Sequence, residues 1–294
     1  MDGKERVAIV VDGGSSMRQE YPEVAARGVV VMPLDLQFLE NGRLVSYSGS
    51  KITDSDFYRR MRESKVLPQT SGAVIGRAAE IFAGLGKETN DVVSIHITAR
   101  HSVSWESARE GAKIAEEQNP GLRVRVIDSK TISATTWFLA EQAAELSQSG
   151  ATAEEIERVT LETIPKLEVD VVLATMINVV KGGRVLPLVG WIGARLGINP
   201  ILNISAETDG EIRPSTRVRT MNAGRRELVK RAREKGGEIE RLAILHTNDL
   251  AGAEILAELV GEFYPREKIR IYEAGPVIGV HAGERALAIA TQRK

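Results

Sequence analysis

The chain has 294 residues, of which 43% are hydrophobic and 27% charged, and its formal net charge is −1. A nearly neutral chain does not favour the broad basic surface that nucleic-acid binding requires, so we expect no nucleic-acid partner. The absence of cysteine excludes disulfide bonds, thiolate zinc sites and cysteine nucleophiles.

The N-terminal half alternates short β-branched runs with longer amphipathic patterns, as strands and helices do. The runs that predict strands are 6–14, 28–38 with an interruption at Pro33, 91–97 and 122–130. The segments that predict helices are 53–64, 72–87, 104–119 and 132–150. This alternation indicates an α/β fold with a largely parallel sheet and helices on both of its faces.

The C-terminal half mixes hairpin and crossover patterns. Strands are predicted at 169–176, 241–248 and 268–275, and helices at 151–168, 221–237 and 251–265. The remaining segments are a glycine-rich basic stretch (178–205), a hairpin with an Asp-Gly turn (207–220), and a final segment (276–291). In that final segment two apolar runs flank a turn framed by Gly279 and Gly283, which contains His281. At about 150 residues per domain, the length predicts two domains, 1–165 and 166–294, that meet near Pro165.

The first residues pass directly into a predicted strand, without the apolar core and small-residue cleavage site of a signal peptide. No apolar run reaches the ~18 residues that a membrane helix needs. We therefore expect a cytoplasmic protein without stable membrane insertion.

Hydroxyl-bearing residues are frequent in three loops that follow a strand or precede a helix. Open α/β sheets bind ligands beyond the carboxyl ends of their strands, and helix N-termini attract anions. These loops are 12–16, 67–74 and 94–108. The simplest interpretation of Thr70 and Ser71 is that they cap the following helix, and Ser102 and Ser104 have the same explanation. Both interpretations stay open at this point.

The four histidines lie far apart in the sequence. His96 alternates within an apolar strand and is expected to be a core histidine, whereas His101 lies in a loop and is expected to be exposed. His246 ends a strand and has no clear assignment, and His281 is either structural or part of a site.

The sequence lacks the fingerprints of several enzyme classes. It contains no GxxxxGK[ST] or GxGxxG phosphate loop, no HExxH zinc motif and no GxSxG nucleophile elbow. We therefore expect no metal and no cofactor, and nothing in the residues demands catalysis.

Taken together, several segments resemble the DegV family of bacterial fatty-acid-binding proteins along nearly the whole chain. The segments are VAIVVDGGSS, ITDSDFYRRMRESKVLPQTS, VVSIHIT with the following SWESA, VRVIDSKTIS, KGGRV, LGINPIL with the following DGEI, and GPVIGVHAGE. Each is weak alone, but their order and spacing are specific.

The resemblance implies two α/β domains with a lipid-binding cleft between them that holds a long-chain fatty acid. It further implies a non-catalytic carrier, which presents the fatty-acid carboxylate to a separate ATP-dependent fatty acid kinase. That kinase makes an acyl phosphate for phospholipid synthesis.

The resemblance also assigns residues. Thr70, Ser102 and His281 correspond to the family's carboxylate contacts. The secondary head-group or loop contacts are Ser71, Thr98 and Arg184, and the kinase-contact residues are Lys181, Arg217 and Arg219. For Arg217 and Arg219, a solvated basic surface is an equally good interpretation.

The loop 98–104 departs from the family, because it reads TARHSVS where the family has Ser-Ser-x-Leu-Ser-Gly-Thr. Val103 replaces a glycine, and Arg100 and His101 enlarge the loop. This departure motivates an alternative function, an enzyme on the same scaffold that acts on a small anionic or phosphorylated substrate. A further alternative is a regulatory member of the family that binds neither lipid nor kinase.

Overall fold

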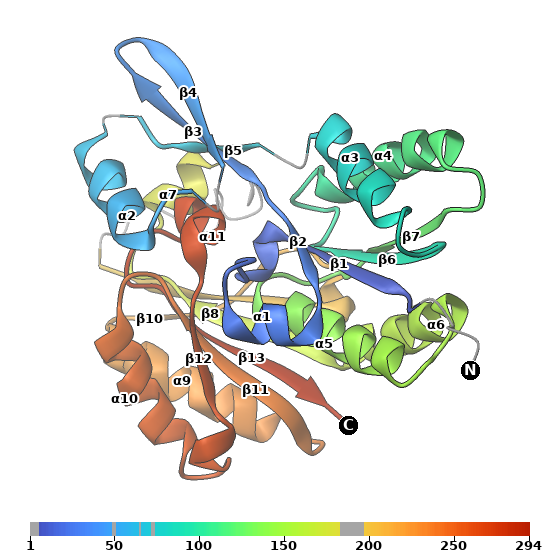
Figure 1. Cartoon of the computed structure of the whole chain (residues 1–294). Helices are drawn as coiled ribbons and strands as arrows, with labels where there is room; N and C mark the ends of the chain where they lie inside the picture. The colour runs from blue at the N-terminus through green and yellow to red at the C-terminus, as the bar shows by residue number, and fades with distance from the viewer. Residues whose placement is uncertain (1–5, 49–50, 65, 72–73, 183–196) are drawn as a thin grey trace.

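A computed structural model describes residues 6–48, 51–64, 66–71, 74–182 and 197–294. The strands in this part of the chain form three sheets: a four-stranded sheet, a six-stranded sheet and a small three-stranded sheet. Figure 1 shows the small sheet projecting at the top, above the two larger sheets.

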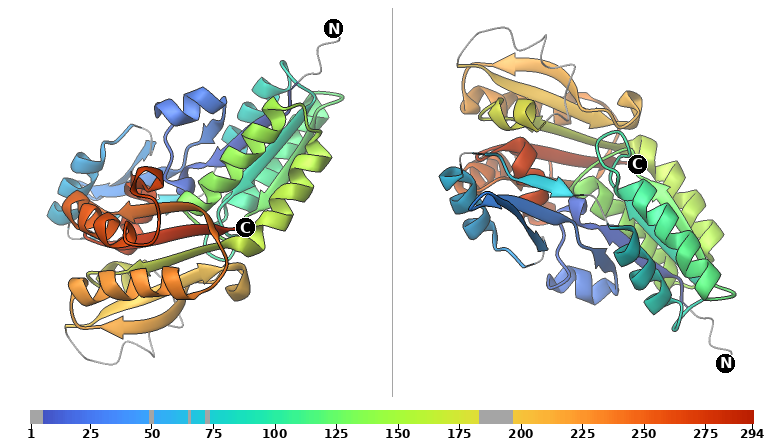
Figure 2. Two further views of the ribbon diagram at one scale, coloured as in Figure 1. Left: turned by 90° about the horizontal axis from the view of Figure 1, so that it is seen from below. Right: turned by 90° about the horizontal axis from the view of Figure 1, so that it is seen from above.

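The four-stranded sheet is parallel throughout, with the order β2-β1-β6-β7. Its strands are β1 (Ala8–Asp12), β2 (Val30–Met32), β6 (Asp91–His96) and β7 (Arg123–Asp128). Helices cover both faces, as Figure 2 shows. One face packs against α3 (Ile75–Leu85) and α4 (Ser104–Gln118), and the other against α1 (Pro22–Arg27), α5 (Ala134–Gln148) and α6 (Ala153–Thr163). The predicted parallel α/β layer is therefore confirmed.

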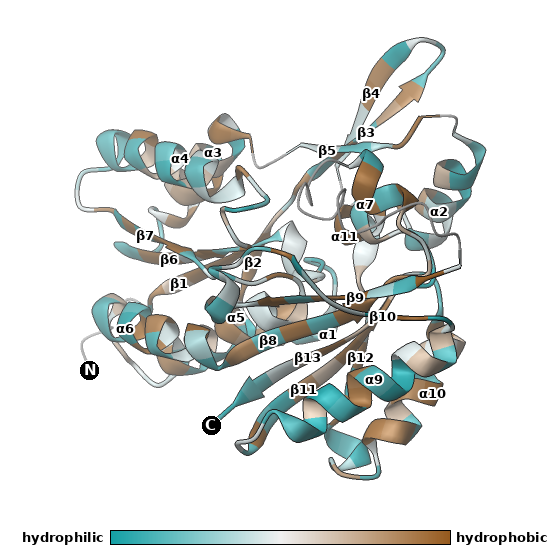
Figure 3. Ribbon diagram, turned by 180° about the vertical axis from the view of Figure 1, so that it is seen from behind, coloured by the Kyte–Doolittle hydropathy of each residue, from teal (hydrophilic) through white to brown (hydrophobic). Residues whose placement is uncertain are grey.

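The strands and helices of this layer follow the hydropathy of their residues. Strand β1 is largely brown in Figure 3, because a central strand of a parallel sheet, buried on both faces, needs a continuous apolar run. Helices α4 and α6 instead alternate between teal and brown turns, with one face in the core and one in solvent. Thr152 begins α6 with a reciprocal capping box to Glu155, as the predicted cap requires.

The six-stranded sheet is mixed, with the order β10-β9-β8-β13-β11-β12, and only β11 and β12 run parallel. Its strands are β8 (Leu167–Val172), β9 (Asn199–Ser205), β10 (Arg213–Val218), β11 (Ile239–His246), β12 (Arg270–Glu273) and β13 (Leu287–Arg293). Helices α9 (Met221–Glu234) and α10 (Leu250–Val260) cover its outer face. Its inner face packs against α5 in the largest apolar cluster.

The small sheet has the order β4-β3-β5 and consists of β3 (Asp35–Glu40), β4 (Arg43–Ser48) and β5 (Gln69–Ser71). Strands β4 and β5 were not predicted from the sequence. Asn41 and Gly42 form the β3–β4 turn with φ of 50° and 76°, values that match the twist of a two-residue hairpin. Helices α2 (Asp54–Glu63) and α11 (Gly275–Ala282) pack against this sheet.

Two predictions for the C-terminal half need correction. Segment 207–220 contains the Asp209-Gly210 turn and β10, but the other strand of the hairpin is β9, which precedes it. Segment 276–291 is not a turn between apolar runs, because Pro276 lies in the first turn of α11 and His281 in its last turn. Gly283, with φ of 72°, ends that helix.

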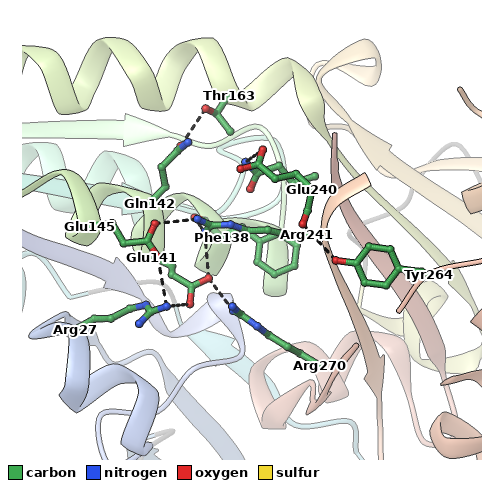
Figure 4. A network of polar contacts seen from close by, with 11 residues as sticks. Arg27, Phe138, Glu141, Gln142, Glu145, Thr163, Glu240, Arg241, Tyr264 and Arg270 are labelled. Carbon is green, nitrogen blue, oxygen red and sulfur yellow. Dashed lines mark hydrogen bonds and ion pairs between the residues drawn. The ribbon is translucent and has the colours of Figure 1, made fainter. Parts of the chain in front are cut away.

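Glu141 of α5 joins the two larger sheets through a buried ion-pair network, drawn in Figure 4. Its side chain is buried, and its carboxylate pairs with Arg27 of α1, Arg241 of β11 (3.0 Å) and Arg270 of β12 (2.7 Å). Helix α5 therefore belongs to the packing of both sheets, and the domain boundary near Pro165 stays a prediction.

No helix within the described ranges is both long enough and apolar enough to cross a bilayer.

Candidate functional site

A cavity of about 710 Å³ lies between the inner face of the six-stranded sheet and the N-terminal layer. Its sheet wall is apolar and includes Val169, Val171, Leu173, Leu202, Ile204, Leu245 and Ala288. The period of two along β8 explains this wall, since Val169 and Val171 face the cavity while Val172 packs on the α9 side. The volume and the apolar lining suit a small organic ligand with a long hydrocarbon part.

A hydroxyl and an imidazole meet at one part of the cavity wall. Thr70 Oγ1 and His281 Nε2 lie 3.1 Å apart, although the two residues are 211 positions apart in the sequence. Thr70 is held by β5, where it pairs with Leu36 of β3, and Ser71 beside it also lines the cavity. The interpretation of Thr70 and Ser71 as helix caps is wrong, because α3 begins after Val74 and the two residues lie in a strand.

Two glycines leave the space that α11 and the His281 ring occupy. A Cβ on Gly279 would lie 2.5 Å from the Tyr58 hydroxyl of α2, and a Cβ on Gly182 would lie 2.8 Å from His281 Nδ1. Any larger residue at either position would move the helix or the ring. Burial raises the pKa of Tyr58, so this hydroxyl stays protonated beneath the helix.

Ser102 also lines the cavity. Its Oγ accepts the backbone N–H of Ser104 at 3.1 Å in a local turn, but the N-cap residue of α4 is Val103, so the interpretation of Ser102 and Ser104 as helix caps is wrong. This bond uses a lone pair of Ser102 and leaves its proton available for an acceptor in the cavity. Val103, which replaces the family glycine, has φ of −80° and is therefore unstrained.

His96 is a core residue, as predicted. Its ring is buried between Ser94 Oγ, 2.8 Å from Nε2, and Ser104 Oγ, 3.2 Å from Nδ1. Asp12 Oδ2 lies 3.5 Å from Nδ1. These contacts hold the beginning of the loop that carries Ser102.

His101 is not exposed, and this prediction is corrected. It lines the cavity half-buried, and its Nε2 accepts the backbone N–H of Ile212 at 2.8 Å. The sequence could not indicate this, because Ile212 lies on a distant hairpin that folds over the loop.

Arg100 lines the cavity as well, and it pairs with Asp209 in the turn before β10. Lys130 lies 3.2 Å from the same carboxylate. The hydrogen bond from Arg100, together with that from Lys130, lowers the pKa of Asp209. Both large residues of the altered loop thus join the loop to the six-stranded sheet.

Four further predicted residues, Thr98, Lys181, Arg217 and Arg219, are not part of the cavity wall. Thr98 is buried against Gly210, and its Oγ1 accepts the backbone N–H of Arg100 at 3.3 Å. Lys181 is exposed at the end of α7 (Ile177–Lys181), and Arg217 and Arg219 are exposed on or just after β10. Arg184 lies outside the described residues.

Four polar residues of the cavity wall were not predicted from the sequence: Ser133, Glu211, His246 and Thr247. His246 Nδ1 lies 2.9 Å from Glu273 Oε2, and Thr247 Oγ1 donates to the Gly283 carbonyl at 2.6 Å. Their role depends on partners that are distant in sequence. In the described part of the chain no group of three His, Asp or Glu residues could hold a metal ion.

The family model, the related sequences and the solved structures that match this chain all belong to the DegV family. Residues 6–294 match the family model described as an uncharacterised protein of the DegV family. A DegV domain-containing protein of Listeria innocua is 28% identical over 284 residues, covering 96% of this chain and 97% of the relative.

Two solved structures share the fold over their full length. One is a DegV family protein from Thermus thermophilus described as fatty acid binding, with TM-score 0.84, 25% identity, and coverage of 98% of this chain and 100% of the other. The other is DegV of Bacillus subtilis, described as a fatty acid binding protein, with TM-score 0.81, 26% identity, and coverage of 99% and 100%.

Proposed function

The chain belongs to the DegV family, and on that premise we propose that it binds a long-chain fatty acid in the cavity between its two larger sheets. The observation that carries the proposal is the apolar cavity of about 710 Å³ with Thr70, Ser102 and His281 on its wall. Fatty acid binding by the Thermus and Bacillus relatives supports it.

The two parts of a fatty acid match two parts of the cavity. Burial of a hydrocarbon tail contributes about 0.8 kcal/mol per CH₂ group, which the apolar sheet wall can supply. A carboxylate is costly to bury unless hydrogen bonds replace its water. The hydroxyls of Thr70 and Ser102 and the imidazole of His281 provide such donors without a fully buried ion pair.

The proposed role is that of a non-catalytic carrier. The protein presents the carboxylate to a separate ATP-dependent fatty acid kinase, and the acyl phosphate then enters phospholipid synthesis. The absence of phosphate-loop fingerprints in the sequence agrees with a kinase activity that resides in a partner. Lys181, Arg217 and Arg219 are exposed and would contact that kinase, with Arg184 close to Lys181 in sequence.

The direct test is the lipid content of the purified protein. Organic extraction followed by mass spectrometry should release a long-chain fatty acid, and delipidated protein should bind a set of such acids in a titration. Protein that releases no lipid and binds none of them would contradict the proposal.

Two substitutions test the carboxylate contacts. Ser102→Ala and His281→Ala should each weaken fatty-acid binding by about 1–3 kcal/mol, because each removes a hydrogen bond to a buried charged group. Isothermal titration with one fatty acid measures the change. Ser215→Ala, at an exposed serine of β10, is the matched control and should bind normally. Unchanged affinity in both site variants would remove these residues from the site.

A further inference from the structure

Two serines from distant segments meet in the wall of the cavity. Ser133 lines the cavity at the start of α5, and Ser16 follows the first turn after β1. Both side chains are buried, and their Oγ atoms lie 2.6 Å apart. The pair is joined to α11 through the carbonyl of Ala274.

The direction of these hydrogen bonds follows from counting protons. Ser16 Oγ donates to the Ala274 carbonyl at 2.9 Å, and a serine hydroxyl has only one proton. The short contact between the two serines therefore requires Ser133 to donate to Ser16. Within the described part of the chain, Ser133 Oγ also accepts no hydrogen bond from the start of α5. Ser133 thus offers only lone pairs to the cavity.

Both serines have a backbone conformation that side chains disfavour, with φ of 66° at Ser16 and 60° at Ser133. Such residues persist where the surroundings hold them, and they concentrate at ligand sites. The backbone N–H of Ser133 also donates to the Gly14 carbonyl at 2.9 Å, so the position of the hydroxyl is well determined.

Ser133 is linked through Ser16 to the beginning of α11, the end of the helix opposite to His281. Ala274 precedes α11 and His281 lies in its last turn, a separation of roughly 10 Å along the helix at 1.5 Å per residue. A fatty acid held by His281 would therefore pass Ser133 several carbons from its carboxylate. A plain hydrocarbon chain leaves this buried acceptor without a donor, which is unfavourable.

We propose that Ser133 accepts a hydrogen bond from a hydroxyl group carried partway along the acyl chain, so that hydroxy fatty acids are the preferred ligands of the cavity. This inference rests on the proposed fatty-acid binding. We expect a fatty acid with a hydroxyl group to bind more tightly than one with a ketone at the same carbon, because only the hydroxyl has a proton to donate to Ser133.

The test compares ligands that differ in one group. Delipidated protein is titrated with stearic acid, with monohydroxystearic acids that carry the hydroxyl at successive carbons, and with the oxostearic acids matched to them. The acids with the hydroxyl at one or two neighbouring carbons should bind about tenfold tighter than stearic acid. The matching oxo acids should show no such gain.

Variants assign the preference to Ser133. Ser133→Gly, which tolerates the positive φ, and Ser133→Ala should each bind the best hydroxy acid no more tightly than they bind stearic acid. Ser16→Ala removes the acceptor for the Ser133 proton and should shift the preference toward the oxo acid. Ser215→Ala should keep the wild-type preference.

The failures are distinguishable. If stearic acid binds but no hydroxy acid gains over it, or if Ser133→Gly keeps the gain, this inference is wrong and the proposed function stands. If neither stearic acid nor any hydroxy acid binds, the proposed function itself fails and the inference fails with it.

Discussion

Glu141→Ala is expected to lower the free energy of unfolding by about 3–5 kcal/mol, the usual cost of removing one partner of a buried ion pair. The Glu141 side chain is 2% exposed and takes ion pairs from Arg27, Arg241 and Arg270. Although burial alone would lower the pKa of Arg270, its hydrogen bond with Glu141 raises it, so this guanidinium stays charged. The substitution therefore leaves three cations between the sheets without their common carboxylate.

Glu145 provides the matched control for this prediction. It lies one turn further along α5, is half-exposed, and pairs with Arg27 and Arg241 in the same network. Glu145→Ala should cost only about 0–1 kcal/mol, because solvent screens an exposed pair. Urea unfolding followed by circular dichroism measures both variants. Equal effects at the two positions would mean that Glu141 is not the residue that joins the sheets.

Ala288→Phe is expected to block the cavity and reduce fatty-acid affinity more than a hundredfold. Ala288 lies on β13, between Val171 of β8 and Leu245 of β11, and all three line the cavity. A benzyl group there that displaces about four CH₂ groups of the ligand removes about 3 kcal/mol of binding free energy. The fold should be retained, because the ring enters space that the protein itself leaves open.

The same change at an exposed alanine separates blocking from a general effect of phenylalanine. Ala251→Phe, on the solvent side of α10, should bind normally, and Ala288→Val should give an intermediate loss. Titration of delipidated protein measures affinity, and thermal unfolding checks the fold. A folded Ala288→Phe protein with full affinity would show that the ligand lies elsewhere.

The errors of sequence interpretation share a physical cause. Strands β4 and β5 are short and lie at the edges of a small sheet, so their residues have no strong periodicity to reveal them. The segment around His281 is apolar on all sides, and a short apolar run does not distinguish a helix from the flank of a turn. In both cases the conformation depends on packing against distant elements.

The residues of the candidate site also depend on contacts between segments that are distant in the sequence. Thr70 and His281 were assigned through resemblance to a family, and nothing in their local sequences indicates that they meet. Nothing in the local sequence indicates the role that we propose for Ser133, because that role depends on its hydrogen bond with Ser16, which lies 117 positions away. His101 was misjudged because the hairpin that covers it is distant in sequence.

The sequence alone determined the alternation of strands and helices, the parallel layer of the N-terminal half and the absence of cysteine chemistry. These properties are local, because burial of one face or both faces of a strand or helix sets the spacing of apolar residues along the neighbouring sequence. The tertiary structure decided where the cavity lies, which hydroxyls and histidines line it, and which groups lie within hydrogen-bond distance of them. Those properties arise only when segments hundreds of residues apart pack together, and no short stretch of sequence contains them.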